Sequence, residues 1–246
     1  MRLEGKTAIV TGAGSGFGAG IARKFAAERA RVMVADINRD AAEEVAREIG
    51  GMAQAVDVGD GASVGTMAEA ALAAFGRVDI LVNNAGITHK PMPMEEVAED
   101  LFDRVFRVNA KSVYLTARAL VPAMKAAKGG AILNVASTAG LSPRANLSWY
   151  NASKGWMITA TKSMAVELAP FGIRVNAIAP VAGETPLLAS FMGEDTPQMR
   201  AKFLSTIPLG RFSTPEDMGN AAGFLCSDEA SMVTGVVMEV DGGRCI

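Results

Sequence analysis

Tyr150 and Lys154 are the two residues whose types and spacing most directly suggest proton chemistry. They lie four residues apart in a stretch with helical periodicity, so their side chains leave one face of a helix. Because an ammonium group favours a neighbouring phenolate, we expect Lys154 to lower the pKa of Tyr150 from its ordinary value of about 10. A tyrosine adjusted in this way can exchange a proton with a substrate near neutral pH.

Ser137 is a third candidate. It directly follows the apolar run 131–136, which is typical of a buried strand. We expect Ser148 to be the N-cap of the helix that carries Tyr150. A serine hydroxyl beside the phenol can bind the same substrate oxygen, so the group predicts reduction of a carbonyl or oxidation of an alcohol. A tyrosine–lysine pair alone is more often part of a solvated helix surface, and the rest of the chain decides between the two interpretations.

The elements that position these residues alternate between strands and helices. Apolar runs typical of strands lie at 6–10, 31–35, 52–56, 78–82, 131–136, 173–178 and 236–240. Helical patterns occupy 19–29, 39–49, 61–75 and 95–128, and two more begin near Ser148 and at Thr214-Pro215. The alternation predicts a single-domain α/β fold over residues 1–246, with a Rossmann-type doubly wound parallel sheet of about seven strands.

Residues 181–212 depart from this alternation. They contain three prolines, several Met and Phe residues and only short helical fragments. The segment falls between the sixth and seventh expected strands, so we expect it to be a substrate lid rather than an ordinary surface excursion.

Glycines between the first strand and the first helix suit phosphate binding, because glycine lets a phosphate approach the N–H groups of a helix N-terminus. They are Gly12, Gly14, Gly16 and Gly18. Asp36 ends the second strand about 20 residues on, where a carboxylate accepts hydrogen bonds from ribose hydroxyls and repels a 2′-phosphate. The loop holds Ser15 rather than a basic residue, and Arg39 is expected on a solvated helix surface. The pattern favours NAD over NADP.

Composition excludes several other classes. The chain has 246 residues, a formal net charge of −2 and no basic stripe, which argues against a nucleic-acid partner. No apolar run approaches the roughly 20 residues of a membrane span, and the N-terminus lacks the apolar core of a signal peptide. Cys226 and Cys245 are expected to be reduced thiols, and a single histidine, His89, leaves little scope for a zinc or Ser-His-Asp site. We expect a cytoplasmic protein.

Together these motifs resemble the short-chain dehydrogenase/reductase family, and the resemblance covers essentially the whole chain. The matching features are Thr11–Gly18 as Thr-Gly-x-x-x-Gly-x-Gly, Asp57-Val58, Asn83-Asn84-Ala85-Gly86, Asn109, Ser137, Tyr150-x-x-x-Lys154 and Pro180 with Thr185. The family usually has Pro-Gly after the sixth strand. Here Val181 follows Pro180 and the glycine is displaced to Gly183, which places the local loop path in question.

The resemblance implies a role for each matching residue. Tyr150 would be the general acid or base, Ser137 would orient the substrate oxygen, and Lys154 would bind the nicotinamide ribose. Asn109 would hold a water that relays protons from Lys154 to solvent. Hydride passes directly to or from NAD, so no metal is needed. The implied cofactor contacts are Gly12, Ser15, Gly16, Phe17, Gly18, Asp36, Ile37, Asp57, Val58, Asn84, Ala85, Gly86, Tyr150, Lys154, Pro180, Val181, Gly183 and Thr185. The resemblance also implies a homotetramer.

The substrate is less strongly specified. Residues expected around the reactive centre are 138–141, 144–149, His89, Glu184, Leu187, Leu188, Phe191 and Met192, with Trp149, Leu188, Phe191 and Met192 as an apolar wall. His89 is more often a solvated loop residue, and Arg144 either binds an anionic substrate or faces water.

We expect a small secondary alcohol or ketone, for instance a polyol or sugar. A 3-oxoacyl-[acyl-carrier-protein] reductase is the first alternative, although Asp36 and Phe171 lack the basic character that such enzymes tend to present. A non-catalytic NAD-binding regulator is the second, disfavoured because Asn109, Ser137, Tyr150 and Lys154 are all present.

Overall fold

Seven parallel strands form one sheet in the computed structural model, which describes residues 1–246, in the order β3-β2-β1-β4-β5-β6-β7. The strands are β1 (Thr7–Thr11), β2 (Arg31–Asp36), β3 (Met52–Ala55), β4 (Ile80–Asn83), β5 (Gly130–Val135), β6 (Ile173–Pro180) and β7 (Val237–Val240). The strand order reverses between β1 and β4. This doubly wound α/β topology, expected from the sequence, opens a crevice at the carboxyl ends of those two strands.

The helices are α1 (Gly16–Ala27), α2 (Arg39–Ile49), α3 (Gly61–Phe75), α4 (Glu99–Phe106), α5 (Ser112–Ala126), α6 (Ser148–Leu168), α7 (Leu188–Met192), α8 (Pro197–Leu204) and α9 (Pro215–Cys226). A π-helical turn, Arg107–Lys111, joins α4 to α5, and short 3₁₀ turns lie at Met94–Glu96, Thr138–Gly140, Ala169–Phe171 and Asp228–Ala230. No helix has both the length and the apolar character required to cross a membrane.

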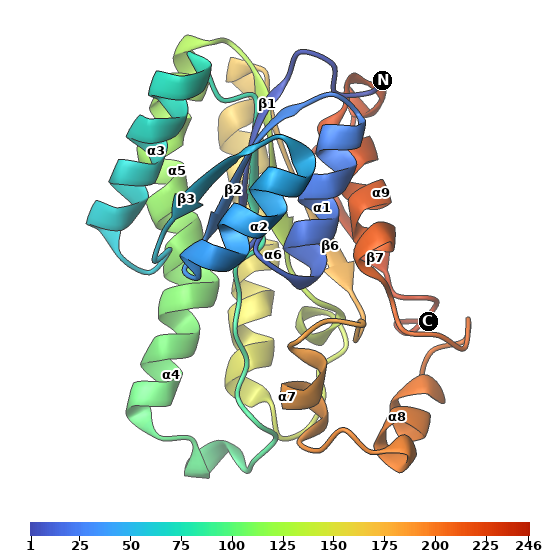
Figure 1. Cartoon of the computed structure of the whole chain (residues 1–246). Helices are drawn as coiled ribbons and strands as arrows, with labels where there is room; N and C mark the ends of the chain where they lie inside the picture. Colours follow the sequence, from blue (N-terminus) through green and yellow to red (C-terminus); the bar gives the residue numbers. More distant parts are fainter.

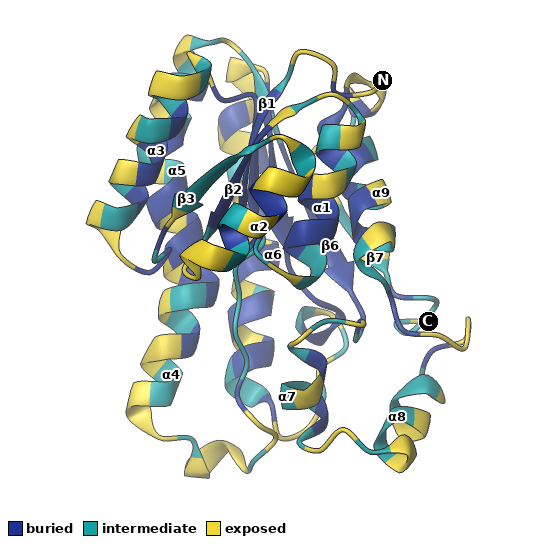
Figure 2. Ribbon diagram, in the orientation of Figure 1, coloured by how far each residue is buried: buried dark blue, intermediate teal, exposed yellow.

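Helices cover both faces of the sheet (Figure 1). Along β1, Ala8 and Val10 belong to a core cluster with residues of α1, α2 and α9, whereas Ile9 belongs to a second cluster with residues of α3, α5 and α6. Alternate side chains of a strand point to opposite faces, so a strand covered on both sides is apolar throughout. The buried residues accordingly follow the strands and the inward sides of the helices (Figure 2).

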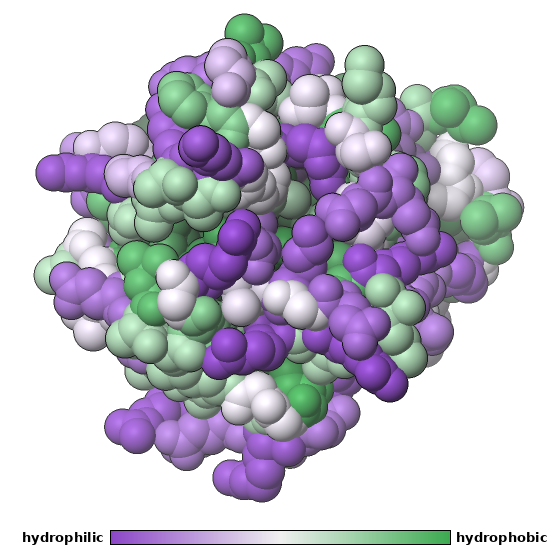
Figure 3. Space-filling model, turned by 90° about the horizontal axis from the view of Figure 1, so that it is seen from above, coloured by the Kyte–Doolittle hydropathy of each residue, from purple (hydrophilic) through white to green (hydrophobic).

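Segment 181–212 forms a smaller packed unit beyond the sheet. Its core cluster consists of Val181, Leu188, Met192, Ile207 and Phe212. Its helices α7 and α8 extend past the same end of the molecule as α4 (Figure 1). The opposite end carries a mixed surface of hydrophilic and hydrophobic side chains (Figure 3).

Most element boundaries shift by one to three residues from expectation, and the larger differences concern α4 to α6. The helix expected over 95–128 starts at Glu99, ends at Ala126 and contains the π-helical turn. Ser148 is the first helical residue rather than the N-cap of α6. Leu147 holds the N-cap position without a side-chain cap, because it is buried against Ala139 and Tyr150 and packing fixes the helix start. The cap at Thr214 is as expected, with a capping box to Asp217.

We expect Gly20→Ala to destabilise the protein, because a Cβ on Gly20 would collide with the backbone of Pro215 where α1 packs against α9. Overpacking of this kind costs about 1–3 kcal/mol. The matched control is Gly65→Ala in α3, where nothing lies within 4 Å of the added Cβ. A helical Gly→Ala change without a clash gains about 0.5–1 kcal/mol. Urea denaturation of both variants measures the difference, and equal effects would contradict the close packing of α1 and α9.

Candidate active site

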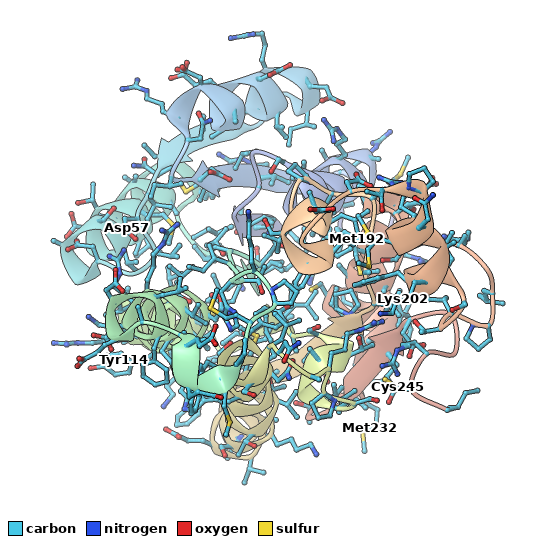
Figure 4. All side chains as sticks on the ribbon, turned by 90° about the horizontal axis from the view of Figure 1, so that it is seen from below. Asp57, Tyr114, Met192, Lys202, Met232 and Cys245 are labelled. Carbon is cyan, nitrogen blue, oxygen red and sulfur yellow. The ribbon has the colours of Figure 1, made fainter.

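A cleft of about 490 Å³ opens at the carboxyl ends of the strands. Figure 4 looks onto this end of the molecule, with Asp57 toward one side and Met192 and Lys202 of segment 181–212 toward the other. Predicted cofactor and catalytic residues that line the cleft are Gly12, Ser15, Gly16, Phe17, Asp36, Ile37, Asp57, Val58, Asn84, Ala85, Gly86, Ser137, Tyr150, Lys154, Pro180, Val181, Gly183 and Thr185. Gly18 and Asn109 lie behind its wall.

The glycine loop is tied to the loop after β4. Asn84 donates from Nδ2 to the carbonyls of Thr11 (2.8 Å) and Gly12 (3.0 Å), and the Thr11 hydroxyl accepts the N–H groups of Asn84 and Ala85. Gly18 allows this arrangement, because a Cβ there would run into the Gly12 carbonyl and the Asn84 amide. Gly18 therefore shapes the cleft without lining it.

The start of α1 fits a pyrophosphate. Ser15 is its N-cap residue, but the Ser15 side chain makes no capping hydrogen bond, so the first N–H groups of the helix remain available to an anion. Gly16 has a φ of 53°, and a Cβ added to it would lie 3.2 Å from Thr185. The glycine loop and the segment after β6 thus approach each other closely across the cleft, and a side chain at position 16 would crowd Thr185.

Asp36 faces the same loop. Its Oδ2 accepts the N–H of Gly14 and its Oδ1 accepts the N–H of Asn38, both at 2.9 Å. A carboxylate oxygen has a second lone pair, so each can still accept a ribose hydroxyl. Ile37 is 74% exposed and lines the cleft beside Asp36, so its apolar side chain is suited to pack against the face of an adenine ring. Arg39 pairs with Glu43 at 2.8 Å on the helix surface, as expected.

The catalytic candidates Tyr150 and Lys154 are both 4% exposed, and Ser137 is buried next to them at the end of β5. The Lys154 ammonium donates to the carbonyl of Val135 at 2.8 Å, and its Nζ lies 6.0 Å from the centre of the Tyr150 ring. The phenol, the ammonium and the hydroxyl therefore converge on one wall of the cleft, and the sequence-based expectation of their proximity is correct.

The expected effect of Lys154 on Tyr150 is wrong. Burial raises the pKa of Tyr150 to about 12, and the Ser137 side chain, which acts in the opposite direction, offsets only part of this. Burial also lowers the pKa of Lys154 to about 8. Removal from water disfavours the charged form of both groups, and the ammonium is directed to a backbone carbonyl rather than to the phenol.

Asn109 lies in the π-helical turn and is fully buried. Its Oδ1 accepts the N–H of Ile87, and its Nδ2 donates to the carbonyl of Ile87 and to Ser153 Oγ. Asn109 therefore fixes the chain immediately after Gly86. A Cβ on Gly86 would lie 3.4 Å from both Asn109 Oδ1 and Lys154 Nζ, so the two polar groups flank that glycine.

Val181 causes no backbone strain, since the residues other than glycine with positive φ are Arg29, Lys128 and Asn146. The backbone path after β6 is therefore compatible with valine at position 181. Val181 is buried in the core of segment 181–212, and its φ needs no glycine.

Several residues expected around the substrate lie elsewhere. Trp149 packs edge-on against Phe102 and donates to the carbonyl of Met94, while Leu188 and Met192 belong to the core of segment 181–212. His89 is buried rather than solvated, with Nδ1 at 2.8 Å from the carbonyl of Lys90.

Phe191 does line the cleft and contacts Tyr150 edge-on at 5.1 Å. Arg107, which pairs with Asp57, and Phe203 of α8 were missed, because neither belongs to a recognisable motif.

Known proteins resemble the chain over its full length. The family model described as enoyl-(acyl carrier protein) reductase matches residues 12–244. A 4-formylbenzenesulfonate dehydrogenase of Comamonas testosteroni is 50% identical, with 100% of each chain covered. A 3-oxoacyl-[acyl-carrier-protein] reductase of Thermotoga maritima is 41% identical, again with 100% of each covered. The crystal structure of a 3-ketoacyl-(acyl-carrier-protein) reductase from Brucella melitensis complexed with NADH is 52% identical, with a TM-score of 0.95 over 99% of this chain and 100% of that one.

The chain belongs to the short-chain dehydrogenase/reductase family. It is an oxidoreductase of CH–OH groups, which confirms the class expected from the sequence.

The buried ammonium of Lys154 predicts a specific pH dependence of stability. Its pKa of about 8 in the folded protein lies below the unfolded value of 10.5, so the unfolded state binds more protons between these two pH values. The free energy of unfolding of the parent should rise, relative to that of Lys154→Met, between pH 8 and pH 10.5 by about 3 kcal/mol, and the difference should be constant below pH 8. Urea titrations from pH 7 to pH 10 test this. Parallel curves for the two proteins would show that Lys154 is not forced toward its neutral form.

Proposed function

We propose that the protein transfers a hydride between NAD(H) and a small secondary alcohol or ketone, with Tyr150 as the general acid and base. The supporting observation is that Tyr150, Ser137 and Lys154 line the same cleft as the glycine loop and Asp36. A nicotinamide cofactor bound there supplies or accepts the hydride.

The residues of the chain then handle the proton and the orientation of the substrate. Tyr150 is protonated at neutral pH, since burial raises its pKa from the ordinary value of 10.0 to about 12, and its hydroxyl can donate a proton to the oxygen of a carbonyl substrate as hydride arrives. Ser137 binds the same oxygen. The Lys154 ammonium uses one donor on Val135 and keeps others for the nicotinamide ribose. For Asn109 the proposed role is a water-mediated relay to Lys154, supported by the position of both groups beside Gly86.

The preference for NAD over NADP rests on Asp36. A 2′-phosphate would meet this carboxylate, and the nearest basic candidate, Arg39, is engaged with Glu43. The similar Brucella structure is a complex with NADH. The remaining proposed cofactor contacts are the cleft-lining residues named above, with Gly18 acting through the shape of the loop.

Four further properties belong to the proposal. Residues 1–246 act as one domain, and segment 181–212 serves as the substrate lid, supported by its separate core and by the contact of Phe191 with Tyr150. The subunits form a homotetramer, supported by exposed apolar side chains on α5 and α6, among them Tyr114, Trp156 and Val166. A cytoplasmic location is supported by two free cysteines.

A 3-oxoacyl-[acyl-carrier-protein] reductase is the second candidate, because two of the similar proteins carry that name. Docking of an acidic carrier protein requires a basic surface. Lys125 lies over the ring of Phe171 at 4.1 Å, and Lys128 is close by in sequence, which is a thin basic patch. Turnover of an acetoacetyl thioester faster than of simple ketones would favour this candidate.

Tyr150→Phe tests the catalytic assignment. The substitution removes the proton donor but keeps the ring against Phe191, so we expect kcat to fall by about 10²-fold or more while the affinity for NAD is retained. NADH formation across an alcohol panel measures kcat, and fluorescence titration measures cofactor binding. In the parent, alcohol oxidation should keep rising with pH without reaching a plateau below the alkaline limit of the assay, because the pKa of Tyr150 is about 12. Equal turnover by parent and variant would remove Tyr150 from the mechanism.

Asp36→Asn tests the cofactor preference. The amide oxygen can still accept one hydrogen bond, but the negative charge is lost, so NAD should bind about tenfold more weakly and the gap between NAD and NADP should narrow. Arg39→Ala is the control, because Arg39 contacts Glu43 rather than the cleft. The dissociation constants of both cofactors are measured for each variant. Unchanged constants for Asp36→Asn would refute its role.

A further inference from the structure

Arg144 lies at the substrate end of the cleft, and Arg244 lies outside the cleft lining but close enough to repel it. Neither guanidinium forms a salt bridge. Arg144 is in the loop after β5 and lines the cleft, as does Leu147. Arg244 belongs to the C-terminal tail. No carboxylate lies within 4.0 Å of either guanidinium, in contrast to Arg200 and Arg211 of the same region, which pair with Asp195 and Asp217. Burial and the repulsion from Arg244 both lower the pKa of Arg144.

Arg144 is held in one orientation by groups that do not neutralise it. Its Nη2 donates to Thr206 Oγ1 at 3.2 Å, and its guanidinium lies over the ring of Phe203 at 4.5 Å. Its own carbonyl accepts a hydrogen bond from Asn151. A guanidinium presents its N–H donors as a rigid planar fork, so those not used by Thr206 remain for a ligand with matching acceptors.

Arg244 supports the same loop from the other side. Its Nη1 donates to Ser142 Oγ at 3.2 Å, and its Nε is buried without a hydrogen-bond partner. The tail that carries it is fixed to the end of segment 181–212, since the carbonyl of Gly242 accepts the N–H of Leu209. Two like charges close together in a partly buried site are unfavourable unless an anion compensates them.

The neighbourhood of Tyr150 has the opposite character. Ala139, Leu147 and Tyr150 form an apolar cluster against which Phe191 packs. The cleft thus offers an apolar wall beside the reacting phenol and the unpaired guanidinium of Arg144 beyond it, with Arg244 outside the lining. A neutral polyol would leave those charges without a counter-ion.

We propose that the substrate carries an oxyanion, a carboxylate or a sulfonate, at the end remote from its carbinol or carbonyl carbon. Arg144 binds this group through its free N–H donors, and Arg244 adds positive potential from behind the 142–144 loop. This inference rests on the proposed function, because one cleft must accept both ends of the substrate. It narrows the substrate class from neutral alcohols and sugars to anionic hydroxy or oxo compounds with an apolar middle.

The test compares benzoate with its neutral isostere benzamide, each titrated calorimetrically into the full-length protein in the presence of NAD⁺. We expect the parent to bind benzoate about tenfold or more tightly than benzamide, as is usual for a charge-assisted hydrogen bond. Arg144→Met should abolish this preference, Arg144→Lys should keep part of it, and Arg244→Met should weaken it. Equal binding of the two probes by the parent, or an undiminished preference in Arg144→Met, overturns the proposal.

The ratio of the two affinities separates ligand binding from a merely structural role. If Arg144 only anchored α8 through Phe203 and Thr206, its loss would weaken both probes equally and leave the ratio unchanged. A second pair of probes is pantetheine 4′-phosphate and pantetheine. An Arg144-dependent preference seen only for this phosphate would assign the arginine to a carrier-protein thioester and overturn the proposal. The titration needs no turnover, so a failure to transfer hydride to any alcohol would contradict the proposed function alone.

Discussion

The hydrogen bonds between Asn84 and the Thr11–Gly12 backbone are the constraint on which the site depends. They join the loops after β1 and β4, the two neighbouring strands between which the strand order reverses. At this switch point the helices that follow the two strands lie on opposite faces of the sheet. With the two loops fixed, the uncapped start of α1, the carboxylate of Asp36 and the end of β5 all face one cleft. The geometry of this half of the cleft therefore follows from side-chain-to-backbone hydrogen bonds at strand ends.

Burial is the second determinant, and it acts on charge. Tyr150 and Lys154 leave one face of α6, yet the surrounding apolar packing shifts the pKa of the phenol upward and that of the ammonium downward. Tyr150 thus stays protonated beside a Lys154 whose ammonium is destabilised, in a wall of the cleft from which water is excluded. Such an arrangement is costly for the folded state, and perturbed pKa values of this kind are typical of functional sites.

The sequence predicted the sheet, its order of elements and many of the residues that line the cleft, because these depend on local signals. These signals are apolar runs of strand length, a glycine loop before a helix and a carboxylate at a strand end. Each of them predicts one local structure. The pKa of Tyr150 was not predictable from its spacing to Lys154, since burial is a tertiary property. The π-helical turn that places Asn109 has no distinct periodicity. Phe203 reaches the cleft only because segment 181–212 folds back, and Trp149 leaves it because Phe102 offers a better contact.

The separate core of segment 181–212 has a consequence for the shape of the cleft. Val181, Leu188, Met192, Ile207 and Phe212 pack among themselves, apart from the two clusters that hold the sheet together. Substitutions on α8 can therefore change the packing of this segment without disturbing the two clusters around the sheet. The shape of the cleft beside Tyr150 can therefore vary through residues such as Phe203 of α8 while the sheet and its flanking helices keep their packing.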